Sequence, residues 1–337
     1  MTQQPLLGAW IRRFLLEHLA SERNLSRNTQ LSYRDTFCLL IPFAAEKLHK
    51  AVDKMAVTDL SAHLVRSFQT YLRDARNCST NTRNQRLAAI HALALFVGGR
   101  SPEHLSWCSE VRAVPFQKAP RTVIHYLEKP EMDALLAAVD QRTAQGRRDH
   151  ALLLFLYNSG ARAEEAARLT IANLNFSPTD WNGQAYVQIH GKGGRTRQCP
   201  LWPITVREID SLIGGRQPQQ HVFLNRRQVP ITRYGIFEMV KRHAQTAALN
   251  MPSIAAKQVS PHIIRHTTAT HLLRAGVDIN TIRGWLGHVS LSTTNIYAEI
   301  DLEMKAKALA KCELSEAPPD NTHWRDSPSL MEFLRTL

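Results

Sequence analysis

A histidine and an arginine three residues apart form the most informative pair of reactive side chains. His262 and Arg265 occur in SPHIIRHTTATHLLRAG (260–276), where Ser260 before a proline predicts a helix start and Gly276 predicts its end. Residues at i and i+3 share a helix face, so both side chains should project from the first turn. Backbone N–H groups and the positive end of the helix dipole favour an anion there. The segment therefore predicts an anion-binding site.

Arg162 and Lys192 could add positive charge to such a site. Arg162 follows Gly160 in NSGARAEEAARL, at an expected junction between two helices, and Glu165 is spaced to pair with it. Lys192 lies in GKGG, where glycines permit a tight turn and close approach to a ligand. Each pattern alone is weak. The first also fits an ordinary surface ion pair, and the second matches neither a Walker A loop nor a dinucleotide-binding fingerprint.

A histidine and a tyrosine follow in GWLGHVSLSTTNIYAEI (284–300). Gly287 is expected to end one helix and Ser290 to cap the next, which leaves His288 in the turn and Tyr297 on the second helix. Tyrosine on a helix usually packs in a core or an interface. With an ordinary pKa near ~10, it attacks at neutral pH only where a positive field and a proton acceptor assist it.

Together these side chains fit phosphoryl transfer at a phosphodiester without a metal ion. Arginine forks bind non-bridging oxygens and counter the charge that grows in the transition state. Lysine or histidine can protonate a departing oxygen. A zinc site is the alternative, because His262 and His266 are four residues apart and His271 follows. The HExxH glutamate is absent and no carboxylate lies nearby in sequence, which disfavours zinc and a metal-dependent nuclease.

The charge balance favours a nucleic-acid partner. The chain has 337 residues, enough for two domains, and its 42 Lys and Arg against 29 Asp and Glu give a net charge of +13. A protein that is merely basic is the alternative at this point. Five scattered cysteines without metal-ligand spacing indicate a reducing compartment. No signal peptide is recognisable and the run ALLLFLY is too short to span a bilayer, so we expect a cytoplasmic protein.

Residues 1–105 predict a helical domain with DNA-binding character. Apolar residues recur with helical spacing in four segments, near 10–18, 26–43, 58–72 and 80–97. Arg83 and Arg86, near the start of the fourth segment, are candidate DNA contacts. Strand alternation is absent from this region, so we expect a four-helix domain.

The rest of the chain predicts a linker at 106–128, a second domain at 129–312 and a tail at 313–337. Residues 98–128 lack periodicity and carry Gly, Pro and basic residues, of which Lys118 and Arg121 could contact phosphates. The second domain combines a β-hairpin around GKGG, with strands at 185–190 and 195–201, with helices. We therefore expect a mainly α protein of two domains, the second mixed α+β. Its later helices are expected at 205–213, 232–247, 261–275, 278–286 and 290–312.

These motifs resemble those of the tyrosine recombinase family, which includes phage-type integrases and Xer-like site-specific recombinases. SGARAEE, HGKGGRTR, HIIRHTTATHLLRAG and LGHVSLSTTNIY are similar to its motifs and stand in the family's order over 125–312. SRNTQLSYRDTF and TRNQRLAAIHAL resemble its helical, SAM-like core-binding domain. HTTATH stands where many members have Ser-Phe, which changes packing more than chemistry. The resemblance implies the catalytic residues Arg162, Lys192, His262, Arg265, His288 and Tyr297, with Glu165 in a supporting role.

The resemblance also implies a mechanism. Tyr297 would attack the scissile phosphate of duplex DNA and leave a 3′-phosphotyrosyl link and a free 5′-hydroxyl. Arg162 and Arg265 would bind the phosphate and stabilise the transition state, while His262 assists proton transfer from the nucleophile. The 5′-hydroxyl of a partner strand would then restore a phosphodiester.

Two further roles follow from the same resemblance: Lys192 would protonate the leaving 5′-oxygen, and His288 would hydrogen-bond the phosphate. Because the covalent link conserves the bond energy, the resemblance implies neither ATP nor a divalent metal nor any other cofactor.

Family members act as four protomers on two DNA sites and often pass a C-terminal helix to a neighbour. The resemblance thus implies a homotetramer on double-stranded DNA at the nucleoid, with room for accessory recombination proteins. SLMEFLRTL (329–337), anchored by Leu330, Phe333 and Leu334, is the candidate exchanged segment, and packing on its own protomer is an equal alternative. The long extension past Tyr297 favours a mobile-element integrase or transposase. Two alternatives are open: a non-catalytic DNA-binding protein on this fold, and a type IB topoisomerase.

Overall fold

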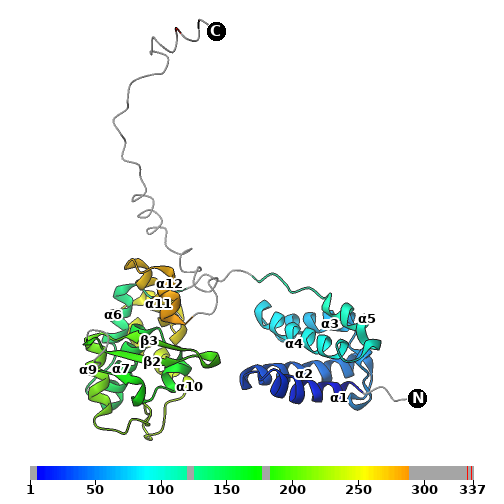
Figure 1. Cartoon of the computed structure of the whole chain (residues 1–337), viewed down its shortest axis with the longest axis horizontal. Coiled ribbons are helices and arrows are strands. Elements are labelled where there is room, and N and C mark those ends of the chain that lie inside the picture. Colours follow the sequence, from blue (N-terminus) through cyan, green and yellow to red (C-terminus); the bar gives the residue numbers. More distant parts are fainter. Residues whose placement is uncertain (1–5, 120–124, 177–182, 288–331, 333–334, 336–337) are drawn as a thin grey trace. The chain divides into compact units, whose positions relative to one another are not determined.

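The computed structural model describes residues 6–119, 125–176 and 183–287, together with Glu332 and Arg335. The chain divides into two compact units, residues 1–122 and 123–337, each with its own hydrophobic core. Figure 1 shows that the first unit is built of helices and the second of helices around a small sheet. The predicted mainly α class with two domains is confirmed. No helix in the described ranges is long and apolar enough to cross a membrane.

Serine caps start three helices of the first unit. The side chains of Ser26, Ser61 and Ser79 each accept a hydrogen bond from the backbone N–H three residues on, which satisfies one donor that a helix start leaves unpaired. The longer helices of this unit are α1 (Leu7–Arg13), its π-helical continuation η1 (Phe14–Glu22), α2 (Arg27–Leu48), α3 (Ala62–Asp74), α4 (Thr80–Gly98) and α5 (Leu105–Arg112). Short 3-10 turns join them at η2 (Val52–Lys54), η3 (Val57–Asp59) and η4 (Pro102–His104).

Helix α5 corrects the predicted end of the first domain. We expected four helices and a linker from residue 106, but Trp107 and Val111 of α5 are buried in the core of the first unit. The indole of Trp107 donates a hydrogen bond to the Leu60 carbonyl at 3.0 Å. The core reaches Val114, so the connecting segment begins later than predicted. An eight-residue helix has too few apolar positions for its period to stand out in sequence.

The second unit combines its helices with a three-stranded antiparallel sheet of order β1-β2-β3. The predicted hairpin is confirmed, with Val187 opposite Cys199 and His190 opposite Thr196. The short strand β1 pairs with β2 and was not expected from the sequence. The strands are β1 (Leu174–Asn175), β2 (Tyr186–His190) and β3 (Thr196–Pro200). The longer helices are α6 (Lys129–Ala137), α7 (Ala144–Ser159), α8 (Ala163–Ala167), α9 (Pro203–Ile213), α10 (Arg233–Ala248), α11 (Pro261–Arg274) and α12 (Ile279–Leu286). The 3-10 turns are η5 (Ile171–Asn173), η7 (Lys192–Gly194) and η8 (Pro252–Lys257).

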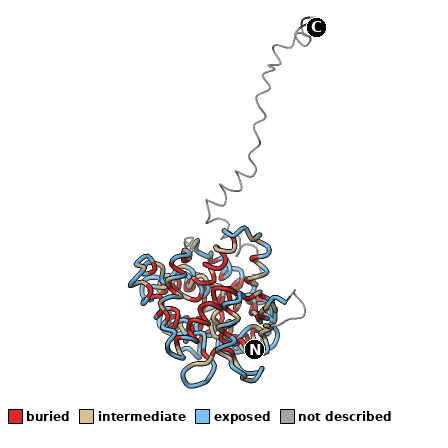
Figure 2. The backbone as a smooth tube through the Cα atoms, turned by 90° about the vertical axis from the view of Figure 1, so that its left-hand side faces the viewer, coloured by how far each residue is buried: buried red, intermediate tan, exposed pale blue. Residues whose placement is uncertain are grey.

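Helix α7 runs through the core of the second unit, as its all-round apolar sequence predicts. Every residue from Arg148 to Ser159 is buried, and Figure 2 shows buried segments gathered in the interior. Helix α11 packs against α7, where the Thr268 hydroxyl donates to the Tyr157 carbonyl at 2.7 Å. Thr267 accepts a hydrogen bond from the Leu127 backbone N–H at 2.9 Å. Two threonines of HTTATH thus form hydrogen bonds inside the second unit.

Candidate active site

The turn after α7 presents the first site arginine. Gly160 ends α7 in the left-handed conformation, with φ of 60°, and Arg162 then stands at the N-cap of α8. A Cβ on Gly160 would lie 2.5 Å from Leu286 Cδ2, in addition to the backbone strain of a positive φ. Only glycine therefore fits where the end of α7 meets the end of α12.

Arg162 and Glu165 form the expected pair, and Glu165 is the more buried partner. Glu165 accepts hydrogen bonds from Arg162 Nη1 at 2.7 Å and from the Arg162 backbone N–H at 2.9 Å. Its other donor is Arg197 Nη2 on β3, at 2.7 Å. Burial alone would raise the pKa of Glu165, but hydrogen bonds and charge from Arg197 and Arg162 hold the pKa below its ordinary value. Glu165 is therefore an ionised carboxylate between two guanidiniums.

Arg265 is fixed by the backbone. The residue is 2% exposed, and its Nη1 and Nη2 donate to the carbonyls of Gly160 and Leu286, both at 2.6 Å. These carbonyls lie at the C-terminal ends of α7 and α12, where the helix dipole favours a cation. One guanidinium thus joins three helices in a fixed orientation.

His262 lies exposed on the first turn of α11, as predicted, one turn before Arg265. Its ring meets that of His266 edge-on, with centroids 4.3 Å apart. Desolvation, with the charges of Arg265 and Arg162, lowers the pKa of His262, and the pKa of His266 falls to about 4. A neutral imidazole beside two guanidiniums can accept a proton at neutral pH.

Lys192 lies in the turn between β2 and β3, as the hairpin pattern predicts. The Gly191 backbone N–H donates to the Arg195 carbonyl at 2.7 Å, and Gly193 and Gly194 have positive φ angles of 76° and 74°. These glycines allow the short η7 turn that carries the lysine.

The structure brings together Arg162, Glu165, His262 and Arg265 at the junction of α7, α8, α11 and α12. His288 and Tyr297 lie outside the described residues, as do most of the predicted tail and the helix expected at 290–312. Gly287, directly before His288, caps α12 in the left-handed conformation with φ of 65°. The predicted stop at this glycine is thus confirmed.

Arg197 belongs to this constellation but is missing from the residues singled out in the sequence. Strand alternation places Arg197 on the same face of β3 as the buried Cys199. A charged residue at an inward-facing strand position is seldom left unpaired. The alternation of inward-facing and outward-facing residues in RTRQCPL was thus the sequence signal that could have identified Arg197.

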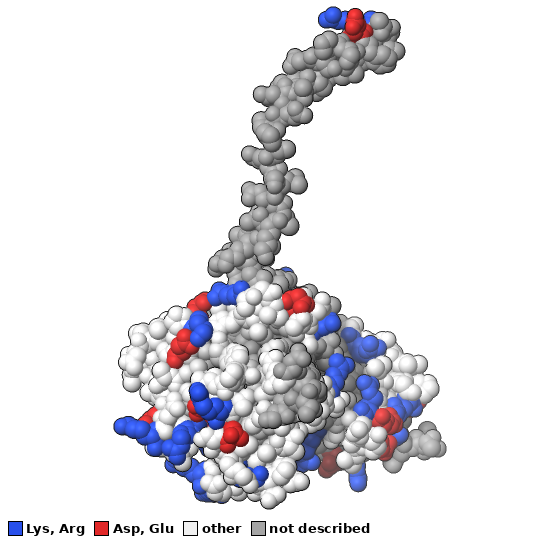
Figure 3. Space-filling view, turned by 60° about the vertical axis from the view of Figure 1, so that its left-hand side comes forward, with Lys and Arg blue, Asp and Glu red and all other residues white. Residues whose placement is uncertain are grey.

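The predicted DNA contacts outside this site differ in exposure. Arg83 is 6% exposed and donates from Nη2 to the Thr80 hydroxyl at 3.2 Å, which leaves little of its guanidinium at the surface. Arg86 is half-buried and Lys118 is exposed. Arg121 lies outside the described residues. On the face drawn in Figure 3, Lys and Arg side chains form several groups.

The described residues show no group of three or more His, Cys, Asp and Glu side chains placed to hold a metal ion. The imidazole rings of His262 and His266 contact each other edge-on in this part of the structure.

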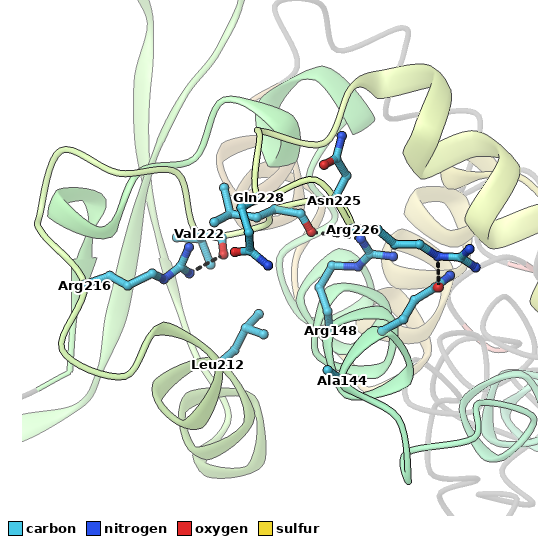
Figure 4. Close-up of a pocket in the computed structure, with 10 residues that line it drawn as sticks. Ala144, Arg148, Leu212, Arg216, Val222, Asn225, Arg226 and Gln228 are labelled. Atoms are coloured by element: carbon cyan, nitrogen blue, oxygen red, sulfur yellow. Dashed lines mark hydrogen bonds between the residues drawn. The ribbon is translucent and has the colours of Figure 1, made fainter.

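A cavity of about 380 Å³ lies elsewhere in the second unit, between the start of α7, α9 and the segment 222–228 (Figure 4). Its lining includes none of the predicted site residues that the structure describes. Its three arginines are held by protein acceptors: Arg216 by backbone carbonyls, Arg148 by Asp149 and a carbonyl, and Arg226 by Gln145. These guanidiniums stabilise the surrounding loop, and the cavity is separate from the candidate active site.

Two family descriptions match the chain in the order of its two units. Residues 125–304 match the Phage integrase family, and residues 11–97 match the Phage integrase, N-terminal SAM-like domain. The second match agrees with the expected core-binding domain.

Curated relatives extend over nearly the whole chain. A putative integrase/recombinase y4rC of Sinorhizobium fredii is 35% identical, covering 100% of both chains. Tyrosine recombinase XerC of Pelobacter propionicus is 32% identical over 94% of this chain and 99% of its own.

Solved structures share the fold at low sequence identity. The Tn1549 transposon integrase in complex with transposon right end DNA matches with a TM-score of 0.66 and 15% identity, over 90% of this chain and 99% of that one. XerH site-specific recombinase bound to difH substrate matches with a TM-score of 0.64 and 18% identity, over 91% and 95%. The family matches, the relatives and the arginine-rich site agree, and the chain belongs to the phage integrase family of tyrosine site-specific recombinases.

Proposed function

We propose that this recombinase cuts and rejoins duplex DNA at specific sites through a 3′-phosphotyrosyl intermediate on Tyr297. The observation that carries the proposal is the fixed placement of Arg265. Its guanidinium is held by the carbonyl of Gly160, two residues before Arg162, which supports one shared anion-binding site for the two arginines. Two guanidiniums in fixed positions can bind the non-bridging oxygens of a phosphate and stabilise a pentacoordinate transition state.

The proposed reaction balances without a cofactor. The Tyr297 hydroxyl oxygen forms a bond to phosphorus as the bond from phosphorus to the 5′-oxygen breaks. The tyrosine proton passes to the neutral imidazole of His262, and Lys192 protonates the departing 5′-oxygen. His288 hydrogen-bonds the phosphate. Attack by a 5′-hydroxyl of the partner strand reverses these steps and releases the tyrosine.

The biological task that we propose is integration or transposition of a mobile element. The putative integrase/recombinase y4rC, similar over its whole length, and the fold of a transposon integrase that binds transposon end DNA support this proposal. In it, four copies of the chain assemble on two DNA sites, and the segment 329–337 is passed between protomers or packs on its own.

The test first requires the DNA site. Fragmented DNA of the source organism is incubated with the protein in EDTA and quenched with detergent, and the ends that stay attached to protein are sequenced. A duplex nicked beside that site then serves as a suicide substrate. We expect a covalent adduct in EDTA, strand exchange between two sites, and no adduct from Tyr297→Phe, which still binds DNA.

The matched control is Tyr71→Phe, which removes a hydroxyl from a tyrosine packed against the core of the first unit. It should form the adduct at the wild-type rate. An adduct that survives Tyr297→Phe would contradict the nucleophile assignment. Relaxation of supercoiled DNA that lacks the site would indicate topoisomerase activity, and binding without cleavage by the wild type would indicate a DNA-binding protein.

A further inference from the structure

Arg197 contacts Glu165 from the protein interior, whereas Arg162 contacts Glu165 from the solvent side. Its Nη2 donates to Glu165 Oε2 at 2.7 Å, and its side chain is 9% exposed. Arg162 Nη1 donates to the other carboxylate oxygen, Oε1, at 2.7 Å, and its side chain is 41% exposed. One buried carboxylate therefore bridges an inner and an outer guanidinium.

The charges of these three groups do not cancel. Two guanidiniums and one carboxylate leave one net positive charge, and the outer guanidinium is the one that faces solvent. A buried carboxylate is costly unless it is paired and hydrogen-bonded, so Glu165 attracts any guanidinium within reach. Because Arg197 pairs with Oε2 from the interior, Arg162 need not neutralise Glu165 by itself.

Arg197 also lies close to the glycines that precede two other predicted site residues. A Cβ on Gly287 would lie 3.3 Å from both Cδ and Nη1 of Arg197, and a Cβ on Gly191 would lie 3.7 Å from Nη1. Gly191 precedes Lys192 in the hairpin turn, and Gly287 precedes His288. The same side chain thus fills the space between α8, the hairpin turn and the end of α12.

We infer that Arg197 is a positioning residue, which neutralises Glu165 from within so that Arg162 keeps its charge for the scissile phosphate. The inference rests on the proposed function and extends it to a buried residue outside the predicted catalytic set. Without Arg197, Glu165 would hold Arg162 more strongly in the ion pair that the two residues already form and would compete with the phosphate for Arg162.

The test is a double-mutant experiment on the full-length protein with the suicide substrate. Arg197→Met keeps the length of the side chain but removes its charge. We expect covalent adduct formation to slow by about 10- to 100-fold, because displacement of one group in an active site costs rates of this size. Glu165→Gln in the same background should restore most of the lost rate, because a neutral amide no longer holds Arg162. Arg197→Lys should slow adduct formation less than Arg197→Met does.

Three measurements separate positioning from a structural role: the single-turnover rate, DNA affinity and the thermal unfolding midpoint. The matched control is Arg142→Met, at an arginine whose side chain is 90% exposed and paired with Asp140. It should leave all three unchanged.

The inference is overturned if Arg197→Met cleaves at the wild-type rate. It is also overturned if Glu165→Gln fails to speed up a folded Arg197→Met variant. If Arg197→Met does not fold, the same comparison is made with Arg197→Lys, which Glu165→Gln should accelerate. Failure of the proposed function itself gives a different result, since the wild type would then form no adduct.

Discussion

Helices α8 and α11 each present an arginine to the same site but hold it in different ways. Arg162 is partly exposed and shares a carboxylate with Arg197, whereas Arg265 is buried and donates to two backbone carbonyls. A carboxylate neutralises a guanidinium, but a carbonyl only orients it. The α11 arginine is therefore held in a fixed orientation by the backbone, and the α8 arginine is held by a carboxylate that it shares with Arg197.

The sharpest test of this difference replaces each arginine by methionine. Both variants should lose about 100- to 1,000-fold in adduct formation, because each removes charge stabilisation from the transition state. Their stabilities should differ. Arg265→Met strips two buried carbonyls of their donor, at about 1–3 kcal/mol for each. Arg162→Met removes a partly exposed ion pair and should cost less than about 1 kcal/mol.

Scanning calorimetry, which can separate the transitions of the two units, measures these stabilities. Equal destabilisation by the two variants would contradict the distinction between a backbone-held and a carboxylate-held arginine.

A second test disturbs the contact on which Arg265 depends. Gly160→Ala combines a positive φ with a 2.5 Å contact to Leu286, whereas Gly214→Ala at the end of α9 has a positive φ of 37° and no atom within 4 Å of the new Cβ. We expect Gly214→Ala to cost about 1 kcal/mol and Gly160→Ala about 1–3 kcal/mol more. Only Gly160→Ala should slow adduct formation. Similar losses of stability in the two variants would mean that the ends of α7 and α12 separate easily.

A third and smaller effect tests the lowered pKa of His266 through the pH dependence of stability. Burial and the charges of His262 and Arg265 lower the pKa of His266 to about 4, below its ordinary value of about 6.5. Between these pH values the unfolded chain binds more protons than the folded one, so stability falls as the pH drops from about 6.5 to 4. The upper limit is about 3 kcal/mol, at ~1.4 kcal/mol for each pH unit.

His266→Gln should flatten this pH dependence in denaturation curves measured from pH 4 to pH 7. His63→Gln, at an exposed histidine of α3, is the control and should keep the wild-type slope. An unchanged slope in His266→Gln would exclude His266 as its source.

Much of the fold follows from short-range signals in the sequence. The proline after Ser260 and the glycines at 160 and 287 mark helix ends, and the structure has helix ends there. The hairpin around Lys192 follows from two alternating segments and their glycines. These features depend on residues adjacent in the chain, which is why sequence patterns predict them.

The features that the sequence did not predict depend on contacts between residues that are distant in the chain. Helix α5 is recognisable only once Trp107 is seen to donate to Leu60, and β1 has only two residues. In the site, the sequence indicates Arg162, Glu165, His262 and Arg265 by type and spacing. Strand alternation can mark Arg197 as facing inward, but its contact with Glu165 spans 32 residues, so the sequence does not identify its partner.

The bond from Arg265 to the Leu286 carbonyl couples ligand binding to the end of α12. Linkage is reciprocal: an anion that fixes the Arg265 guanidinium also stabilises the last turn of α12, and any event that displaces that turn weakens anion binding by the same free energy. The chain continues from Leu286 through Gly287 to His288 and Tyr297. Occupancy of the proposed phosphate site would thereby be coupled, through one 2.6 Å hydrogen bond, to the segment that carries the proposed nucleophile.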